Sequence, residues 1–277
     1  MGRKALRSMG ERKISDIARK VSTEDYLHKV MEILEAEDGR TFEEKKCEVI
    51  EFLKDKEDAL LEKRVLEAAI NDETGKCLKQ KFWQTGDRIQ ATPEVLLRKV
   101  CELDRENYIK LQKENSFMKS MLKEESYQTL FWNEHIQDKS LMLTIEVAGE
   151  YAGYCGINNL SKDKWEISIE LLKCWQHQGI GYKAIKVMLT ELKERLNVNE
   201  FRIKVEPDNY ASQKLFEKLG AVPYGIAEFM LHKEEDIIRC EEENMEAIDD
   251  KLVTVAEKFG VDPRKLLSHV LEYKLEW

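Results

Sequence analysis

Two glycines stand in a short segment whose residues could bind an anion. The segment 175–182 reads WQHQGIGY, and it lies between a predicted strand and a predicted helix. Gly179 and Gly181 would let the backbone turn tightly, so that amide groups converge at the positive end of the helix dipole. The segment is not a Walker A loop or a dinucleotide fingerprint, because a Gly-Lys-Ser/Thr and a third glycine are missing. An ordinary strand-to-helix turn accounts for the glycines equally well.

Two carboxylates precede this segment on the predicted strand 165–172. The period of two along a strand places Glu166, Ser168 and Glu170 on one face. Either glutamate could accept a proton or bind a cation. The competing interpretation, an exposed strand face balanced by lysines, carries about equal weight for each glutamate.

The composition of the chain excludes several classes of protein. The chain has 277 residues and a net charge of −9, which disfavours nucleic acid and anionic membranes as partners. No apolar run approaches the roughly 20 residues that would span a bilayer. The 6 cysteines include no C-x-x-C pair and the 5 histidines have no metal-ligand spacing, so we expect reduced thiols, a cytoplasmic location and no metal.

Glycine and proline divide the chain into three regions. No proline precedes Pro93, and 7 of the 13 glycines lie between Gly149 and Gly225. Residues 1–92 are predicted to be helical, with a Thr41/Glu44 capping box, and within them residues 71–92 are predicted to be a connection that could contain one short element. For residues 94–102 the pattern allows either a helix that starts at Pro93 or a strand.

The central region predicts a mixed α/β sheet. Its elements alternate between the period of a strand and the period of a helix. We expect strands at 141–147, 151–157, 165–172, 201–205 and within 221–231, and helices at 105–133, 181–196 and 211–219.

Two motifs of this region resemble the GNAT superfamily of N-acetyltransferases, which use acyl-CoA. Gln176-x-x-Gly179-x-Gly181 is similar to the family's CoA-binding signature, and residues 205–221, VEPDNYASQKLFEKLGA, resemble its second motif. The resemblance covers residues 94–233 and favours the strand at 94–102. It implies a GNAT-like α/β fold, flanked by a helical N-terminal region at 1–92 and an acidic helical C-terminal extension at 234–277.

The resemblance also implies residue roles. Backbone groups of the strand end would hold the thioester, with amides near Leu171 and Leu172 stabilising the oxyanion, while the loop would hold the pyrophosphate. A carboxylate, Glu166 or Glu170, would remove a proton from the acceptor amine. The residues expected to bind acetyl-CoA are Leu171, Leu172, Lys173, Gln176, Gln178, Gly179, Ile180, Gly181, Tyr182, Lys183, Asn209, Ser212 and Phe216.

Phe216 departs from the family pattern. Many members carry at this position a tyrosine that protonates the leaving thiolate, and phenylalanine cannot donate a proton. Tyr210 and Tyr224 are nearby candidates, of which Tyr210 is our choice, and water could also serve. The CoA thiolate could also leave without an acid.

The resemblance implies an N-acetyltransferase that transfers acetyl from acetyl-CoA directly to an amine of a small molecule or peptide. The alternative is a weakly active or inactive acyl-CoA-binding module whose helical flanks bind partners or form a homodimer. A third interpretation is a modifier of protein or tRNA. It depends only on the seven basic residues within positions 1–20.

Overall fold

The computed structural model describes residues 74–116, 120–161, 164–228 and 231–277, with isolated positions between 33 and 51. The chain divides into two compact units, residues 1–74 and 75–277. In the first unit the predicted capping box is confirmed, because the Thr41 N–H donates to Glu44 Oε2 at 2.7 Å and the Glu44 N–H donates to Thr41 Oγ1 at 3.4 Å. The other predictions for residues 1–73 concern mostly positions outside the described residues.

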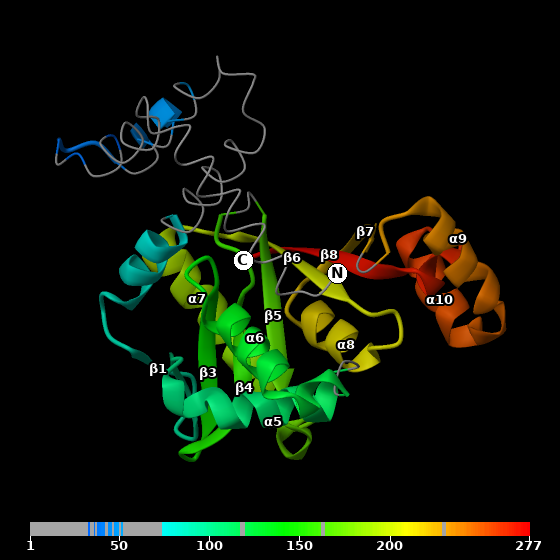
Figure 1. The fold of residues 1–277 in the computed structure, drawn as a ribbon, viewed down its shortest axis with the longest axis horizontal. Coiled ribbons are helices and arrows are strands. Elements are labelled where there is room, and N and C mark those ends of the chain that lie inside the picture. The colour runs from blue at the N-terminus through cyan, green and yellow to red at the C-terminus, as the bar shows by residue number, and fades with distance from the viewer. Residues whose placement is uncertain are drawn as a thin grey trace. The chain divides into compact units, whose positions relative to one another are not determined.

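The second unit is built on one eight-stranded mixed sheet (Figure 1). The strand order is β1-β2-β3-β4-β5-β6-β8-β7, in which β5 and β6 pair in parallel and every other pair is antiparallel. The strands are β1 (Arg88–Gln90), β2 (Val95–Lys99), β3 (Leu141–Val147), β4 (Glu150–Ile157), β5 (Trp165–Leu171), β6 (Glu200–Val205), β7 (Val222–Glu228) and β8 (His269–Glu276).

Helices cover both faces of this sheet. Residues 74–83 are also helical. The α-helices are α5 (Arg105–Asn115), α6 (Glu125–Ile136), α7 (Ile180–Leu196), α8 (Tyr210–Lys218), α9 (Glu234–Glu243) and α10 (Asp250–Phe259). The short 3-10 turns are η1 (Glu102–Asp104), η2 (Met121–Lys123), η3 (Lys173–Trp175), η4 (Met245–Ala247) and η5 (Pro263–Leu267).

Adjacent residues of β4 show which helices lie on which face. Cys155 belongs to the main core, which contains the buried side of α7, whereas Tyr154 belongs to a second cluster with Tyr108 of α5 and Trp132 of α6. Because neighbouring residues of a strand point to opposite faces, α7 covers one face and α5 with α6 covers the other. Phe216 of α8 and Leu252 of α10 are also in the main core, so these helices lie on the α7 side.

Local sequence signals explain where several elements end. The β3–β4 hairpin turns at Ala148 and Gly149, which have φ of 51° and 86°, as a two-residue hairpin turn requires. Helix α10 ends at Gly260, which caps it with φ of 65°. The predicted strands, and the helices at 181–196 and 211–219, are confirmed with small shifts at their ends. The helix predicted at 105–133 is instead two helices, α5 and α6, with a break between Asn115 and Glu125. The strand at 94–102 is present as β2, so the helix alternative is wrong.

Two strands were not predicted. Residues 88–90 form β1, a three-residue edge strand inside the segment predicted to be a connection. Residues 269–276 form β8, which pairs with both β6 and β7. The prediction that residues 234–277 are a helical extension outside the fold is therefore wrong for β8. The helices α9 and α10 are instead an insertion between two neighbouring strands.

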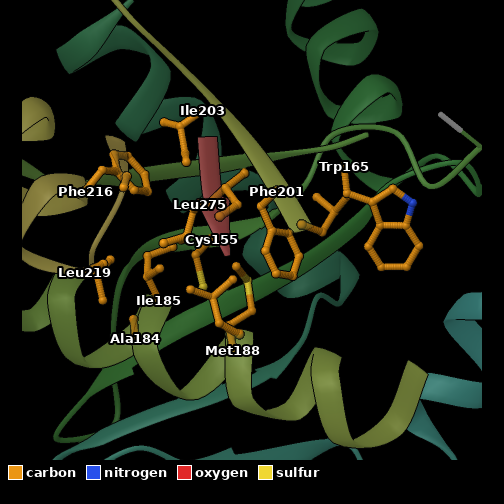
Figure 2. Packing of buried hydrophobic residues seen from close by; sticks show 14 of the residues in the cluster. Cys155, Trp165, Ala184, Ile185, Met188, Phe201, Ile203, Phe216, Leu219 and Leu275 are labelled. Carbon is orange, nitrogen blue, oxygen red and sulfur yellow. The ribbon is translucent and has the colours of Figure 1, made fainter. Parts of the chain in front are cut away.

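The main core joins the sheet to α7, α8 and α10. Figure 2 shows Phe201 and Ile203 of β6, Leu275 of β8 and Ile185 of α7 packed together. Among the described residues, no helix is both long enough and apolar enough to cross a membrane.

Candidate active site

Strands β5 and β6 separate after a short stretch of pairing. Their register covers only Trp165 with Phe201 and Glu166 with Arg202, although β5 continues to Leu171. On its other edge β5 follows an antiparallel ladder with β4, in which the Leu172 N–H donates to the Ala152 carbonyl at 2.9 Å. Hydrogen-bonding direction alternates along a strand. The backbone groups of Ile169 and Leu171 therefore face the opening between β5 and β6.

Side chains of α5 and of the following loop hold the end of β5 in place. The Leu171 carbonyl accepts from Asn115 Nδ2 at 3.0 Å and from Gln176 Nε2 at 2.9 Å. The Lys173 N–H donates to Glu114 Oε2 at 3.2 Å. The Gln176 side chain, predicted to bind the cofactor, thus ties the loop to the strand in this structure.

Leu172 cannot serve the predicted oxyanion role. Its N–H donates to the Ala152 carbonyl, its carbonyl accepts from the Trp175 N–H at 2.8 Å, and its side chain is buried. The prediction of an available Leu172 amide is wrong, because this residue closes the ladder with β4. Leu171 is the residue whose amide faces the opening.

The predicted anion-binding loop leads into the first turn of α7. Gly179 is the N-cap residue with φ of 74°, and no side chain caps the helix. The first amides of a helix have no intrahelical acceptor, so those of Ile180, Gly181 and Tyr182 are available to an anion. Gly181 already has helical backbone geometry, and a Cβ there would lie 3.2 Å from Ile169 Cδ1, a tight contact that a small shift of Ile169 would have to relieve.

Side chains around this first turn are mostly polar or cationic. Gln178 Nε2 donates to the Cys174 carbonyl at 2.6 Å, so its amide group folds back on the loop. Lys183 is exposed on the first turn, and Lys218 Nζ lies 4.6 Å from the centre of the Tyr182 ring. The positive charges add to the helix dipole at this end of α7.

The N-terminus of α8 is capped by a predicted site residue. Asn209 Oδ1 accepts from the Ser212 N–H at 3.1 Å. Tyr210 is the first residue of α8, and burial raises the pKa of its hydroxyl. Phe216 is 3% exposed and packs in the main core with Ile203 (Figure 2). The prediction that Phe216 lines the cofactor site is wrong, because its ring faces the sheet.

Glu170 lies on the opposite face of β5, beneath α5. Its Oε1 accepts from the Tyr154 hydroxyl at 2.8 Å and its Oε2 accepts from Gln112 Nε2 at 3.0 Å. Burial raises the pKa of the Glu170 carboxyl, and the hydrogen bonds from Tyr154 and Gln112 offset part of that increase. A carboxylate with a raised pKa next to an opening between strands is suited to accept a proton.

Glu166 has a different environment, although it lies on the same face. Its Oε1 accepts from Asn158 Nδ2 at 2.9 Å, and its Oε2 lies 3.2 Å from Lys204 Nζ. It also stands where β5 and β6 still pair. Glu166 is therefore an ion-paired residue at the closed end of the opening, whereas Glu170 stands at its open end.

Gln112, Asn115 and Tyr154 were missed by sequence reasoning. Gln112 and Asn115 lie more than 50 positions before the β5 residues that they contact. Only the register of β4 with β5, which places Tyr154 opposite Glu170, brings the hydroxyl to the carboxylate. No local motif carries that information.

The site thus combines a helix N-terminus with free amides, a separated pair of strands and a buried carboxylate on the other face of the same strand end. The uncapped helix N-terminus can bind an anionic ligand, and the buried carboxylate can accept a proton. Residues 94–222 match the family described as the Acetyltransferase (GNAT) domain. The resemblance that the two motifs predict is therefore confirmed for residues 94–222, which match a GNAT acetyltransferase domain.

The individual proteins that the chain resembles have low sequence identity to it. The chain is 28% identical over 112 residues to a Bacillus subtilis (strain 168) protein named as a candidate ribosomal protein bS18-alanine N-acetyltransferase. That match covers 40% of this chain and 71% of the relative.

The chain is similar to solved structures of several acetyltransferases, and two of them illustrate the range. One is the microcin C7 self-immunity acetyltransferase MccE in complex with acetyl-CoA and AMP, with 18% identity, a TM-score of 0.49, and coverage of 69% of this chain and 97% of that one. Another is the Salmonella typhimurium acetyltransferase that modifies the N-terminal serine of ribosomal protein L7/L12, with 17% identity, a TM-score of 0.46, and coverage of 69% and 99%.

Proposed function

We propose that this protein transfers an acetyl group from acetyl-CoA to an amine, with Glu170 as the general base. The observation that carries the proposal is the geometry of β5. Its odd residues Ile169 and Leu171 border the free amides of α7, and its even residue Glu170 points to the α5 side. One strand end therefore serves a cosubstrate on one face and an acceptor on the other.

Acetyl-CoA fits the residues on the α7 side. Three free amides at a helix N-terminus suit a pyrophosphate, and a Cβ at Gly181 would crowd Ile169 beneath them. The unpaired edge of β5 offers backbone groups to the pantetheine amides. Acetyl-CoA supplies the acetyl thioester. Leu171 presents its N–H to the carbonyl oxygen on which negative charge develops.

Glu170 makes the acceptor nitrogen nucleophilic. An ammonium group cannot attack a carbonyl, so Glu170 accepts the proton, directly or through one water. The amine nitrogen bonds to the acetyl carbon and becomes positively charged, the carbon–sulfur bond breaks, and the thiolate leaves with the electron pair. The nitrogen then gives its second proton to water, which leaves a neutral amide. Phe216 is buried, so a proton for the thiolate comes from Tyr210 or from water.

The acceptor that we propose first is the α-amine of a peptide. Its pKa of about 8 leaves a larger neutral fraction at pH 7 than the value of about 10.4 for a lysine side chain. The Bacillus subtilis relative is named for transfer to an alanine of a ribosomal protein. A small-molecule amine is the second acceptor to test.

The decisive experiment measures release of CoA thiol with a panel of peptides and small amines. Glu170→Gln should lower kcat by about 10²- to 10⁴-fold, the usual contribution of a general base. Glu166→Gln is the matched control on the same strand face and should retain most activity. Equal losses in both variants would contradict the assignment of the base.

The binding-module alternative has a distinct result in the same assay. Tight binding of CoA without thiol release on any acceptor would favour it over the enzyme. Gly181→Glu tests the cosubstrate site in either case, because a bulky anion in the first turn of α7 should abolish CoA binding. Retained CoA affinity in this variant would show that the phosphates bind elsewhere.

A further inference from the structure

The carboxylate of Glu170 is held by two residues that belong to different elements. Tyr154 of β4 donates to one oxygen at 2.8 Å, and Gln112 of α5 donates to the other at 3.0 Å. A carboxylate with one donor on each oxygen cannot rotate about its last bond without losing both hydrogen bonds. Its orientation is therefore fixed by the packing of α5 on the sheet.

Aromatic rings fix Tyr154 in turn. The ring of His135 contacts Tyr154 edge to face at a centroid distance of 4.6 Å and stacks on Tyr108 at 4.1 Å. The ring centroids of Tyr108 and Tyr154 are 5.8 Å apart. Burial lowers the pKa of His135 to about 4, so this ring is neutral at pH 7 and packs as an aromatic residue. Tyr154 is thus a rigid donor.

We propose that Tyr154 and Gln112 are positioning residues that hold the Glu170 carboxylate in its orientation for proton transfer. This inference depends on the proposed function, in which Glu170 is the base. Neither residue is assigned to contact the reacting atoms. Each acts through the carboxylate, by aligning its free lone pairs and by setting how readily it binds a proton.

Three neutral tyrosines interact electrostatically with Glu170. They are Tyr108 on α5 and Tyr151 and Tyr154 on β4, and burial raises the pKa of each hydroxyl. Gln112 and Asn115 of α5 face it as neutral amides. Because the two hydrogen bonds favour the charged carboxylate, removal of either donor should raise the pKa of Glu170 further.

The test compares the pH dependence of kcat in Tyr154→Phe, Gln112→Leu and Gln112→Glu. The first two variants should move the acid limb of the profile to higher pH by about one unit, the scale expected for a hydrogen bond to a charged group. Gln112→Glu should move it further, because it places a second carboxylate beside the first. KM for acetyl-CoA should stay within about twofold, since α7 is untouched.

Tyr151→Phe is the matched control. Tyr151 lies on the same strand as Tyr154, and its buried hydroxyl has no hydrogen-bond partner among the residues that the structure describes. This substitution removes the same atom from the same kind of ring without removing a hydrogen bond to Glu170. It should leave the acid limb unchanged. If Tyr154→Phe and Gln112→Leu also leave it unchanged, within about 0.3 unit of Tyr151→Phe, the positioning role is wrong.

A second measurement separates this inference from the proposed function. The pKa of the Glu170 carboxyl can be followed by side-chain ¹³C NMR in the folded wild type and variants without any turnover. If the pKa of Glu170 rises in Tyr154→Phe and does not change in Tyr151→Phe, the positioning role of Tyr154 is supported even if no amine is acetylated. No shift in Tyr154→Phe overturns it, whether or not the protein is active.

Discussion

At the scale of single residues, two glutamates of β5 that look equivalent in the sequence have different surroundings in the structure. Both lie on one face, as the period of two predicts. Their partners differ, because Glu166 meets Lys204 and Asn158 whereas Glu170 meets only neutral donors. An ion pair stabilises a charged carboxylate, while burial beside neutral donors leaves it poised to take a proton. The choice between the two therefore depends on partners that come from other elements.

The charged carboxylate of Glu170 should also destabilise the folded protein. Burial raises its pKa above the usual 4.5, so the folded state binds the proton more tightly than the unfolded state does. The favourable contribution of Glu170 protonation to the free energy of unfolding is complete below pH 4.5. It is lost as the pH rises through the pKa of the folded state. At pH 7 the charged carboxylate therefore lowers the free energy of unfolding.

Glu170→Gln should accordingly be more stable than the wild type at pH 7, by on the order of 1 kcal/mol, while it loses activity. The Gln112 amide can turn its oxygen toward the new amide group. Urea unfolding at pH 7 and at pH 4 measures the effect, and the difference should shrink at the lower pH. A variant that is less stable than the wild type at pH 7 would show that the charge is well solvated in the folded state.

At the scale of elements, the local motifs predicted the α7 and α8 segments well. The reason is that their signals lie within a few residues, such as the glycines before α7 and the asparagine before α8. Gly181 lies within the first turn of α7, where a Cβ would be in tight contact with Ile169, and its predicted role in anion binding stays a prediction. Strand β8 was missed although Leu271, Tyr273 and Leu275 alternate, because a glycine and a proline shortly before it indicated helix ends.

Asn209 links an element to the site. Its side chain was predicted to face the cofactor, and in the structure it caps α8 through the Ser212 N–H. Asn209→Ala should lower the free energy of unfolding by about 1 kcal/mol, the usual value of an N-cap. Asn209→Asp keeps an oxygen acceptor and should retain stability. Urea unfolding measures both.

The same pair of variants tests the predicted contact of Asn209 with CoA. If the side chain only caps the helix, CoA affinity should follow stability, so that Asn209→Asp resembles the wild type. A loss of CoA affinity in Asn209→Asp at unchanged stability would instead indicate a direct contact, since an added negative charge would oppose the phosphates.

At the scale of the whole second unit, the acidic segment after β7 is part of the fold. The buried Glu241 carboxylate forms ion pairs with Arg264 at 3.0 Å and with Lys265 at 2.9 Å. These ion pairs connect α9 to η5. The Tyr273 hydroxyl of β8 donates to Glu217 of α8 at 2.9 Å, and Lys258 of α10 also pairs with Glu217. These contacts connect the parts of the insertion to one another, and they connect α10 and β8 to α8.

Removal of residues 269–277 should therefore unfold the second unit, not trim it. Strand β8 pairs with β6 over six residues and is the partner of β7. It buries Val270, Leu271, Tyr273 and Leu275. At about 1.5–3 kcal/mol for each buried side chain, the loss approaches the whole stability of a typical domain. We expect a chain that ends at Ser268 to show no cooperative thermal transition.

Complementation in trans makes this prediction specific to β8. A synthetic peptide of residues 269–277 should restore a cooperative transition in the shortened chain, because the two neighbouring strands offer their edges to it. A peptide of the same composition in scrambled order is the control, since it cannot place Leu271, Tyr273 and Leu275 on one face. A shortened chain that unfolds cooperatively without any peptide would show that β6 and the insertion are stable alone, and that the sheet does not need β8.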